Sequence, residues 1–234
     1  MKKQKLNTEK MSGTQLVKTI ESLNEKYAKL DVYQRVEALY DDYDVNDIML
    51  TSSFAATSAF LLKVFSDVNK DQVIYFIDTG YHFKETLIYK DYLEQLYGLN
   101  IVNVKAEHKK HALSLETEMW KSQPNRCCHI NKTEPLAAVK KDFKVWVSGL
   151  MRWQSDFRST LDFFEDREDI RKFYPLLDID FIGRDEFIKK HHLPFHPLKS
   201  KGYSSIGCAH CTVPGDDRNG RWNNSPKTEC GLHL

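Results

Sequence analysis

A long apolar run is missing from this chain of 234 residues. No stretch approaches the roughly 20 apolar residues that a transmembrane helix needs, and the lysines of the N-terminus are not followed by the apolar segment of a secretory signal. An excess of one charge is missing too, because 34 Lys and Arg residues nearly balance 33 Asp and Glu residues. We therefore expect a cytoplasmic protein whose partner is neither a membrane nor a nucleic acid.

Cysteine is scarce, and its spacing does not suit an evenly spaced disulfide framework. The five cysteines form three groups, which are the adjacent Cys127 and Cys128, the pair Cys208 and Cys211, and Cys230 alone. Adjacent cysteines do not easily form a disulfide with each other. Four thiols in two pairs suit either a tetrahedral zinc ion or an iron–sulfur cluster, and four unrelated buried thiols are the alternative.

Hydrophobic periodicity divides the chain into three parts. Residues 1–45 are charged and helical in period. Residues 46–200 contain short apolar or β-branched runs separated by helical stretches, which is typical of an α/β fold with a mostly parallel sheet and helices on both faces. Residues 201–234 are rich in Gly, Ser, Asn and Pro, which predicts a loop-rich tail. The expected strands are DIMLTSSF, QVIYFID, LNIVNV and FKVWVSG, and the expected helices cover roughly 57–66, 84–97, 133–141 and GRDEFIKKHH. Thr133 is expected to begin the third of these helices, with Pro135 in its first turn.

Two turns that follow expected strands contain residues suited to anion binding. The stretch SSFAATS, from Ser52 to Ser58, places hydroxyls at the start of a helix, where free N–H groups and the helix dipole favour negative charge. The stretch IDTGYHF, with Asp78 and Gly80 at its tip, follows the next strand. Ordinary strand-to-helix turns are the alternative for both. SSFAATS resembles the phosphate loop Ser-Gly-Gly-x-Asp-Ser of the adenine-nucleotide alpha hydrolases. Phe54 and Ala55 replace the two glycines and Thr57 replaces the aspartate, which favours nucleotide binding over pyrophosphate chemistry.

Seven motifs follow one another along the chain: SSFAATS, IDTGYHFKET, CCHINKTEPL, GLMRWQSDFR, LPFHPLKSKGYSSIGCAHC, DDRNGRW and KTECGLH. Together, from Asp47 to His233, they resemble the assimilatory adenylyl-sulfate/phosphoadenylyl-sulfate reductase family, in its iron–sulfur-containing branch. The resemblance implies an adenine-nucleotide alpha hydrolase-like domain in residues 46–200. It also implies that residues 201–234 hold the second cysteine pair and a mobile catalytic tail.

The resemblance implies a reaction as well. Adenylyl sulfate (APS) would be reduced to sulfite and AMP through an S-sulfocysteine on Cys230, with thioredoxin or glutaredoxin as electron donor, in sulfate assimilation and cysteine biosynthesis. A thiol near the chain end can meet the substrate first and the donor protein next. Beside it, Lys227 would favour the thiolate and Glu229 would oppose it. The resemblance further implies a [4Fe-4S] cluster with the ligands Cys127, Cys128, Cys208 and Cys211.

Polar and cationic residues within the motifs match substrate-binding positions of the family. A guanidinium group donates two parallel hydrogen bonds to a phosphate or sulfate, which suits the arginines. Lys132 matches a lysine of the family that lies between cluster and substrate. A surface role is the alternative for each arginine alone, and a packing or surface role is expected for His196 and His233. The substrate-binding residues implied in this way are Ser52, Ser53, Phe54, Thr57, Ser58, Asp78, Thr79, Gly80, Lys132, Arg152, Arg158, Arg218 and Arg221.

Two departures from the family pattern concern the substrate. Met151 and Val213 stand where the family usually has arginines. Phosphoadenylyl sulfate (PAPS) carries an additional 3′-phosphate that Thr57, Ser58 or a nearby lysine would bind, so the same chemistry on PAPS is one alternative. A nucleotide-dependent pyrophosphatase is a second alternative, and a non-catalytic metal-binding redox module is a third. A homo-oligomer is left open.

Overall fold

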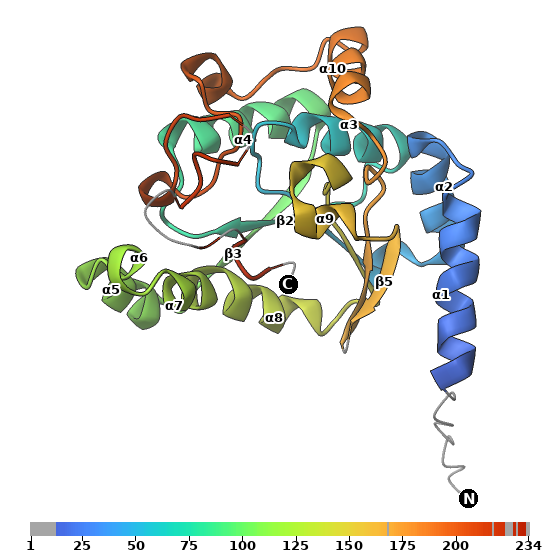
Figure 1. The fold of residues 1–234 in the computed structure, drawn as a ribbon, viewed down its shortest axis with the longest axis horizontal. Helices are drawn as coiled ribbons and strands as arrows, with labels where there is room; N and C mark the ends of the chain where they lie inside the picture. The colour runs from blue at the N-terminus through green and yellow to red at the C-terminus, as the bar shows by residue number, and fades with distance from the viewer. Residues whose placement is uncertain (1–12, 168, 217, 223–226, 228, 233–234) are drawn as a thin grey trace, which may run out of the picture.

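A computed structural model describes residues 13–167, 169–216, 218–222, 227 and 229–232. Its strands are β1 (Ile48–Thr51), β2 (Val73–Asp78), β3 (Asn100–Lys105), β4 (Val145–Val147), β5 (Phe164–Arg167) and β6 (Ile170–Phe173). Within the described residues they form one six-stranded sheet in the order β3-β2-β1-β4-β6-β5 (Figure 1). The pairs are parallel except for β5, which runs antiparallel to β6. The predicted α/β fold with a mostly parallel sheet is confirmed.

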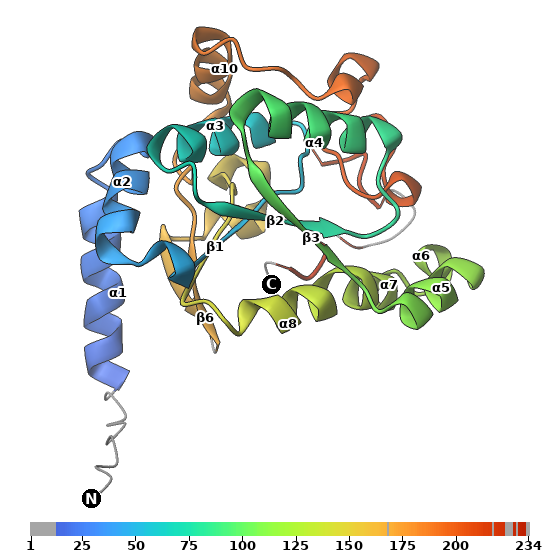
Figure 2. The same ribbon diagram turned by 180° about the vertical axis from the view of Figure 1, so that it is seen from behind.

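Helices cover both faces of this sheet. They are α1 (Gly13–Tyr27), α2 (Val32–Asp42), α3 (Ser58–Val68), α4 (Lys84–Tyr97), α5 (His108–Glu116), α6 (Met119–Ser122), α7 (Pro124–Cys128), α8 (Glu134–Lys140), α9 (Asp156–Ser159) and α10 (Phe181–Lys190). α3, α4 and α10 lie on one face, and α8 lies on the other with α5, α6 and α7 (Figures 1 and 2). Among the helices described, not one is both long and apolar enough to cross a membrane.

β1 is apolar toward both faces because both faces of the sheet are covered. Leu50 belongs to the main core beneath α3 and α4, which also includes Tyr27 of α1 and Val36 of α2. Met49, the preceding residue, belongs to a second core with Trp146 on the face of α8. The N-terminal helices therefore share the main core, and the two cores fix the central strands from both sides.

The predicted start of a helix at Thr133, with Pro135 in its first turn, is confirmed as the boundary of α8, of which Thr133 is the N-cap residue. Thr133 has helical backbone angles and makes no capping hydrogen bond, because the chain is already helical in α7 and continues through the π-helical turn η2 (His129–Thr133) into α8. In this turn the N–H of Glu134 donates to the fifth carbonyl back along the chain, one further than in an α-helix. The regular hydrogen-bond ladder is interrupted there, so Pro135 is tolerated although it has no N–H.

The strand order creates a crevice at one edge of the sheet. β2 lies on one side of β1 and β4 on the other, so the connections diverge at the carboxyl ends of β1 and β4, which is where open α/β sheets bind ligands. Thr51 ends β1, and its hydroxyl donates to the carbonyl oxygen of Val147 at the end of β4 over 3.2 Å. The turns that follow these two strands therefore start side by side.

Candidate active site

A cavity of about 330 Å³ opens at the carboxyl ends of β1, β2 and β4, a size typical of small-ligand sites. Its walls come from the turns after these strands, from η2 and from the C-terminal segment. Cys230 and Cys208 line it. Nine of the predicted substrate-binding residues line the same cavity: Ser52, Ser53, Thr57, Ser58, Thr79, Lys132, Arg158, Arg218 and Arg221.

The turn after β1 is shaped by Phe54. The ring is buried and packs edge-to-face on Phe76, with ring centroids 5.5 Å apart. The backbone of Phe54 has a φ of 47°, in the left-handed region that favours glycine, and its N–H donates to the hydroxyl oxygen of Ser52 at 3.2 Å. Thr57, at the N-cap position of α3, makes no capping hydrogen bond. Its hydroxyl therefore remains available to a ligand in the cavity.

The two cysteine pairs line one small pocket beside the cavity, the sulfur pocket. The first pair belongs to α7. In the second pair, Cys208 precedes the 3-10 turn η5 (Ala209–Cys211) and Cys211 ends it. The N–H of Ala209 donates to the carbonyl oxygen of Tyr81 at 2.7 Å, which ties η5 to the loop after β2. The rings of Trp120 and His210 stack at 4.1 Å, and Tyr81 meets both edge-on. Aromatic side chains therefore cover the sulfur pocket.

The sulfur pocket suits a cluster by its donor set. Burial, reinforced by neighbouring thiols, raises the pKa of Cys127 to about 12 and that of Cys211 to about 11. Burial would also raise the pKa of Cys208, but the charge of Lys132 and a hydrogen bond from Thr79 lower it overall. In the described part of the chain, no group of three or more His, Cys, Asp or Glu side chains is arranged to hold a single metal ion. Four thiols that share one pocket are nevertheless the ligand set that iron–sulfur clusters take.

Lys132 connects the two compartments, because it lines both the cavity and the sulfur pocket. Its side chain is buried. Burial lowers its pKa, but the thiols of Cys208, Cys230 and Cys128 raise it by more, so that the pKa lies above its ordinary value. A buried ammonium group surrounded by sulfur is thereby kept charged next to the cavity.

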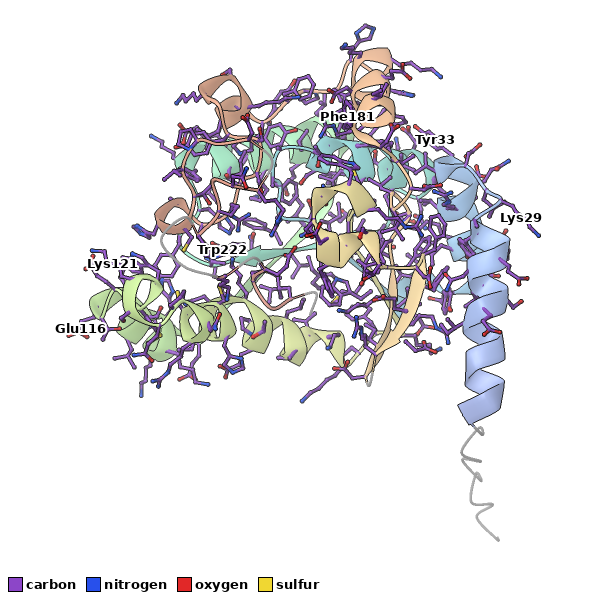
Figure 3. All side chains as sticks on the ribbon, viewed as in Figure 1. Lys29, Tyr33, Glu116, Lys121, Phe181 and Trp222 are labelled. Carbon is purple, nitrogen blue, oxygen red and sulfur yellow. The ribbon has the colours of Figure 1, made fainter. Side chains whose placement is uncertain are left out.

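The side chain of Arg221 lies in the wall of the cavity. Its guanidinium group stacks over the ring of Trp222 at 4.4 Å, and its Nη1 donates to the carbonyl oxygen of Ile206 at 3.2 Å. The backbone N–H of Trp222, labelled in Figure 3, donates to the carbonyl oxygen of Cys211 at 2.9 Å. This hydrogen bond holds Arg221 beside the second cysteine pair. The Nε of Arg221 is buried and has no hydrogen-bond partner among the described residues. A buried donor without an acceptor costs about 1–3 kcal/mol, and an anionic ligand would remove that cost.

Arg158 and Arg218 both contact Glu229. Nε of Arg158 donates to Oε1 of Glu229 at 3.1 Å, and Nη2 of Arg218 donates to Oε2 at 2.9 Å. The charge that was expected to oppose a thiolate at Cys230 is therefore offset by two guanidinium groups. The ammonium of Lys227 was expected to favour that thiolate. It donates to Oδ1 of Asn125, in α7, at 2.6 Å.

Cys230 is half-buried in the cavity. Lys132 and Arg218 are both close enough to interact electrostatically with its thiol. Gly231 follows with a φ of 85°, and Leu232 packs against the second core. The described end of the C-terminal segment, red in the ribbon, thus runs between the sheet and α8 (Figures 1 and 2).

The other four predicted substrate-binding residues lie elsewhere: Phe54, Asp78, Gly80 and Arg152. Asp78 accepts a hydrogen bond from the N–H of Gly80 at 3.1 Å and pairs with Lys105 at 3.2 Å. Arg152 donates to the carbonyl oxygen of Leu161 at 3.2 Å, and the ring of Phe54 is in the core. Their roles in substrate binding stay predictions.

Further residues line the cavity but were not among the predicted substrate-binding residues, including Trp146, Ser148, Trp153, Gln154, Arg184 and Glu229. Gln154 accepts a hydrogen bond from Nη1 of Arg158, and its position four residues earlier in the same motif was a usable signal. Glu229 adjoins Cys230, but nothing in the sequence says that its carboxylate meets two arginines. His196 is buried, so of the packing and surface roles that were expected for it, the structure shows packing. His233 lies outside the described residues.

The chain is similar to known proteins in sequence and in fold. A family model described as the phosphoadenosine phosphosulfate reductase domain matches residues 47–214. Two bacterial proteins named adenosine 5′-phosphosulfate reductase are relatives: that of Lysinibacillus sphaericus (strain C3-41) is 40% identical over 83% of this chain and 87% of its own length. That of Staphylococcus haemolyticus (strain JCSC1435) is 36% identical over 92% of both proteins.

Two crystal structures share the fold. A phosphoadenylyl-sulfate (PAPS) reductase from Candida auris, in a phosphate complex, has a TM-score of 0.71 and 23% identity, covering 88% of this chain and 100% of that one. The FMN adenylyltransferase of Candida glabrata, with FMN and an ATP analogue, has a TM-score of 0.54 and 16% identity, covering 86% of this chain and 75% of that one. These likenesses confirm the adenine-nucleotide alpha hydrolase-like fold.

Proposed function

Because the chain belongs to the phosphoadenosine phosphosulfate reductase family and is thus an oxidoreductase of sulfate reduction, we propose that it reduces APS to sulfite and AMP with electrons from a thioredoxin-type dithiol. The family model covers residues 47–214, and the two bacterial relatives described above carry the name of the APS enzyme. Those names favour APS over PAPS. The observation on which the proposal depends is the location of Cys230 in one cavity with Lys132 and Arg221.

The proposed first step is attack of the Cys230 thiolate on the sulfur of APS. A sulfur–sulfur bond forms, the bond between that sulfur and the bridging oxygen breaks, and AMP leaves with the bond's electron pair. The thiol proton goes to solvent. In the second step a thiolate of the donor attacks Sγ of Cys230 and releases sulfite, and the donor's second thiol then resolves the mixed disulfide. The two electrons come from the dithiol, which ends as a disulfide.

The cations of the cavity are suited to this substrate. Lys132 and Arg218 lie near the thiol, so they would stabilise the Cys230 thiolate. Lys132 would also stabilise the sulfate group that the thiolate attacks. The buried Nε of Arg221 lacks an acceptor among the described residues, and a sulfate or phosphate oxygen would provide one. The hydroxyls of Ser52, in the turn after β1, and of Thr57, at the N-cap position of α3, would bind the other anionic group.

A [4Fe-4S] cluster is proposed as the resident cofactor, with the two cysteine pairs of the sulfur pocket as its ligands. When bound, it would supply a redox-capable, charged group beside Lys132. Lys132, which lines both compartments, would hold a positive charge between that group and the substrate. The aromatic cover formed by Trp120 and His210 would limit access of water to the pocket.

The test is mass spectrometry of anaerobically purified protein mixed with APS, and in parallel with PAPS, without a thiol donor. We expect a sulfonate adduct on the peptide containing Cys230 with APS, no adduct in the Cys230→Ser variant, and unchanged bound iron in that variant. An adduct formed faster with PAPS would transfer the proposal to that substrate. Intact protein that forms no adduct with either nucleotide would contradict the proposed nucleophile and favour a non-catalytic redox module.

A further inference from the structure

The carboxylate of Glu229 is fully engaged in the wall of the cavity. Its side chain is 3% exposed, against 9% for Arg158 and 19% for Arg218. Oε1 accepts from the Ser155 hydroxyl at 3.4 Å and from Nε of Arg158 at 3.1 Å. Oε2 accepts from Nη2 of Arg158 at 3.2 Å and from Nη2 of Arg218 at 2.9 Å. Two donors on each oxygen match the acceptor capacity of a carboxylate.

An apolar contact lies on the other side of Cys230. Leu232 packs against the second core, which contains Leu136 of α8 and Trp146 of β4. Gly231, between the thiol and this contact, has a φ of 85°, and a Cβ there would lie 3.8 Å from Thr133. The thiol is therefore held between a polar contact one residue before it and an apolar contact two residues after it.

The contact of Glu229 also divides the cations of the cavity into two sets. Burial, and next the charge of Arg158, lower the pKa of Arg218 to about 10, while the charge of Glu229 acts in the opposite direction. Two neighbouring guanidinium groups repel each other, and the shared carboxylate offsets this repulsion. Lys132 and Arg221 make no hydrogen bond or ion pair with Glu229 in the described structure, so they remain for the anionic groups of a ligand.

We propose that Glu229 is a positioning residue, which anchors the C-terminal segment on Arg158 and Arg218 and thereby holds Cys230 at the sulfur atom of the substrate. This inference rests on the proposed role of Cys230 as nucleophile. Glu229 does not touch the reacting atoms and acts through the backbone that it shares with Cys230. It also keeps two strong anion binders occupied, so the nucleotide sulfate is directed toward Lys132 and Arg221.

The test compares Glu229→Gln and Glu229→Asp with the wild-type holoprotein. Glutamine keeps the shape but loses the charge, so we expect the rate constant of adduct formation at saturating APS to fall about tenfold or more. AMP, used as the binding probe, is expected to bind as tightly as before or more tightly, because Arg158 and Arg218 are released. Aspartate keeps the charge and is expected to restore part of the rate. Glu85→Gln, which removes an exposed ion pair with Lys201, is the matched control and is expected to change neither quantity.

A second readout needs no substrate. Cys230 is alkylated with iodoacetamide over a range of pH, and the plateau rate at alkaline pH reports access to the thiol rather than its ionised fraction. We expect a plateau about tenfold higher in Glu229→Gln, because the buried ion pair no longer restrains the segment. The inference would be overturned if Glu229→Gln and the wild type had equal alkylation plateaus and equal rates of adduct formation. It would also be overturned if the rate of adduct formation and the affinity for AMP both fell in Glu229→Gln and Glu229→Asp restored neither. If wild-type protein forms no adduct at all, the proposed nucleophile fails, and the alkylation plateaus still decide whether Glu229 anchors the segment.

Discussion

Phe54 shows how a single residue sets the turn at the start of the cavity. Its left-handed backbone costs a non-glycine residue about 1–2 kcal/mol, and the burial of its ring against Phe76 offsets that cost. We expect Phe54→Ala to lower the free energy of unfolding by about 3–5 kcal/mol. Phe54→Gly is expected to be more stable than Phe54→Ala by about 1 kcal/mol, because glycine adopts this conformation without strain. Urea unfolding of both variants measures the difference.

Leu62 provides the control, because it is fully buried in the middle of α3, where the backbone is ordinary helix. There Leu62→Gly should be less stable than Leu62→Ala by about 1 kcal/mol. If the glycine variant were less stable than the alanine variant at both positions, the strain assigned to Phe54 would be contradicted. The sequence showed only that Phe54 stands where related loops have glycine. That a buried aromatic ring holds the glycine-like conformation depends on Phe76, which belongs to another strand.

At the scale of elements, His196 joins the 3-10 turn η4 (Pro197–Lys201) to α4. Its Nδ1 accepts from the N–H of Leu198 at 3.1 Å, so Nε2 carries the proton and donates to the hydroxyl of Thr86 at 3.0 Å. Burial lowers its pKa to about 4, and the nearby Glu85 acts weakly in the opposite direction. The unfolded chain therefore binds more protons than the folded protein between about pH 6.5 and 4, and the stability falls as the pH falls through that range.

We expect this histidine to account for a loss of about 2 kcal/mol in the free energy of unfolding between pH 7 and pH 5. His196→Asn keeps an acceptor for Leu198 but does not titrate, so its loss over the same range should be smaller by that amount. Urea unfolding at the two pH values provides the measurement, with the exposed His108→Asn as control. Equal pH dependence in His196→Asn and the wild type would show that the buried imidazole is not the titrating group.

The elements differ in how far the sequence could predict them. The strands β1 and β4 were predictable because they are short apolar runs that are buried on both faces of the sheet. The hairpin β5–β6 was not predicted, because its sequence is dense in charge. Its charges are paired across the two strands: Glu165 lies opposite Lys172, and Nε of Arg171 donates to Asp166 at 2.7 Å. Pairing of this kind stabilises a hairpin only once the strands are aligned, which local periodicity does not reveal.

At the scale of the whole molecule, the candidate site assembles from segments that are distant in sequence. The cysteine pairs were identifiable from their spacing and the resemblance, since thiols in two close groups point to a shared ligand. The contact of Arg158 with Glu229 was not identifiable, because 71 residues separate the partners and each alone resembles an ordinary charged residue. Whether a charged residue lies in solvent or in a buried ion pair depends on its burial, and the burial of a charge is known only from the folded structure.

The two cysteine pairs lie in different parts of the fold, so removal of the proposed cluster should loosen contacts between those parts. α7 carries one pair, and the segment around η5 carries the other, held to the loop after β2 by the N–H of Ala209 and to α6 by the stacking of His210 on Trp120. These contacts do not replace four metal–sulfur bonds. After oxidative removal of iron in the presence of a chelator, we expect hydrogen exchange to accelerate in residues 119–132 and 203–222. Exchange in β1, β2 and β4 should stay slow, because the two cores do not involve the sulfur pocket.

Anaerobically purified Cys127→Ser should lack iron and show the same pattern. Iron-loaded and iron-free protein with equal exchange in both regions would show that the cluster does not join these parts of the fold. Wild-type protein that is free of iron when purified anaerobically would contradict the cofactor itself.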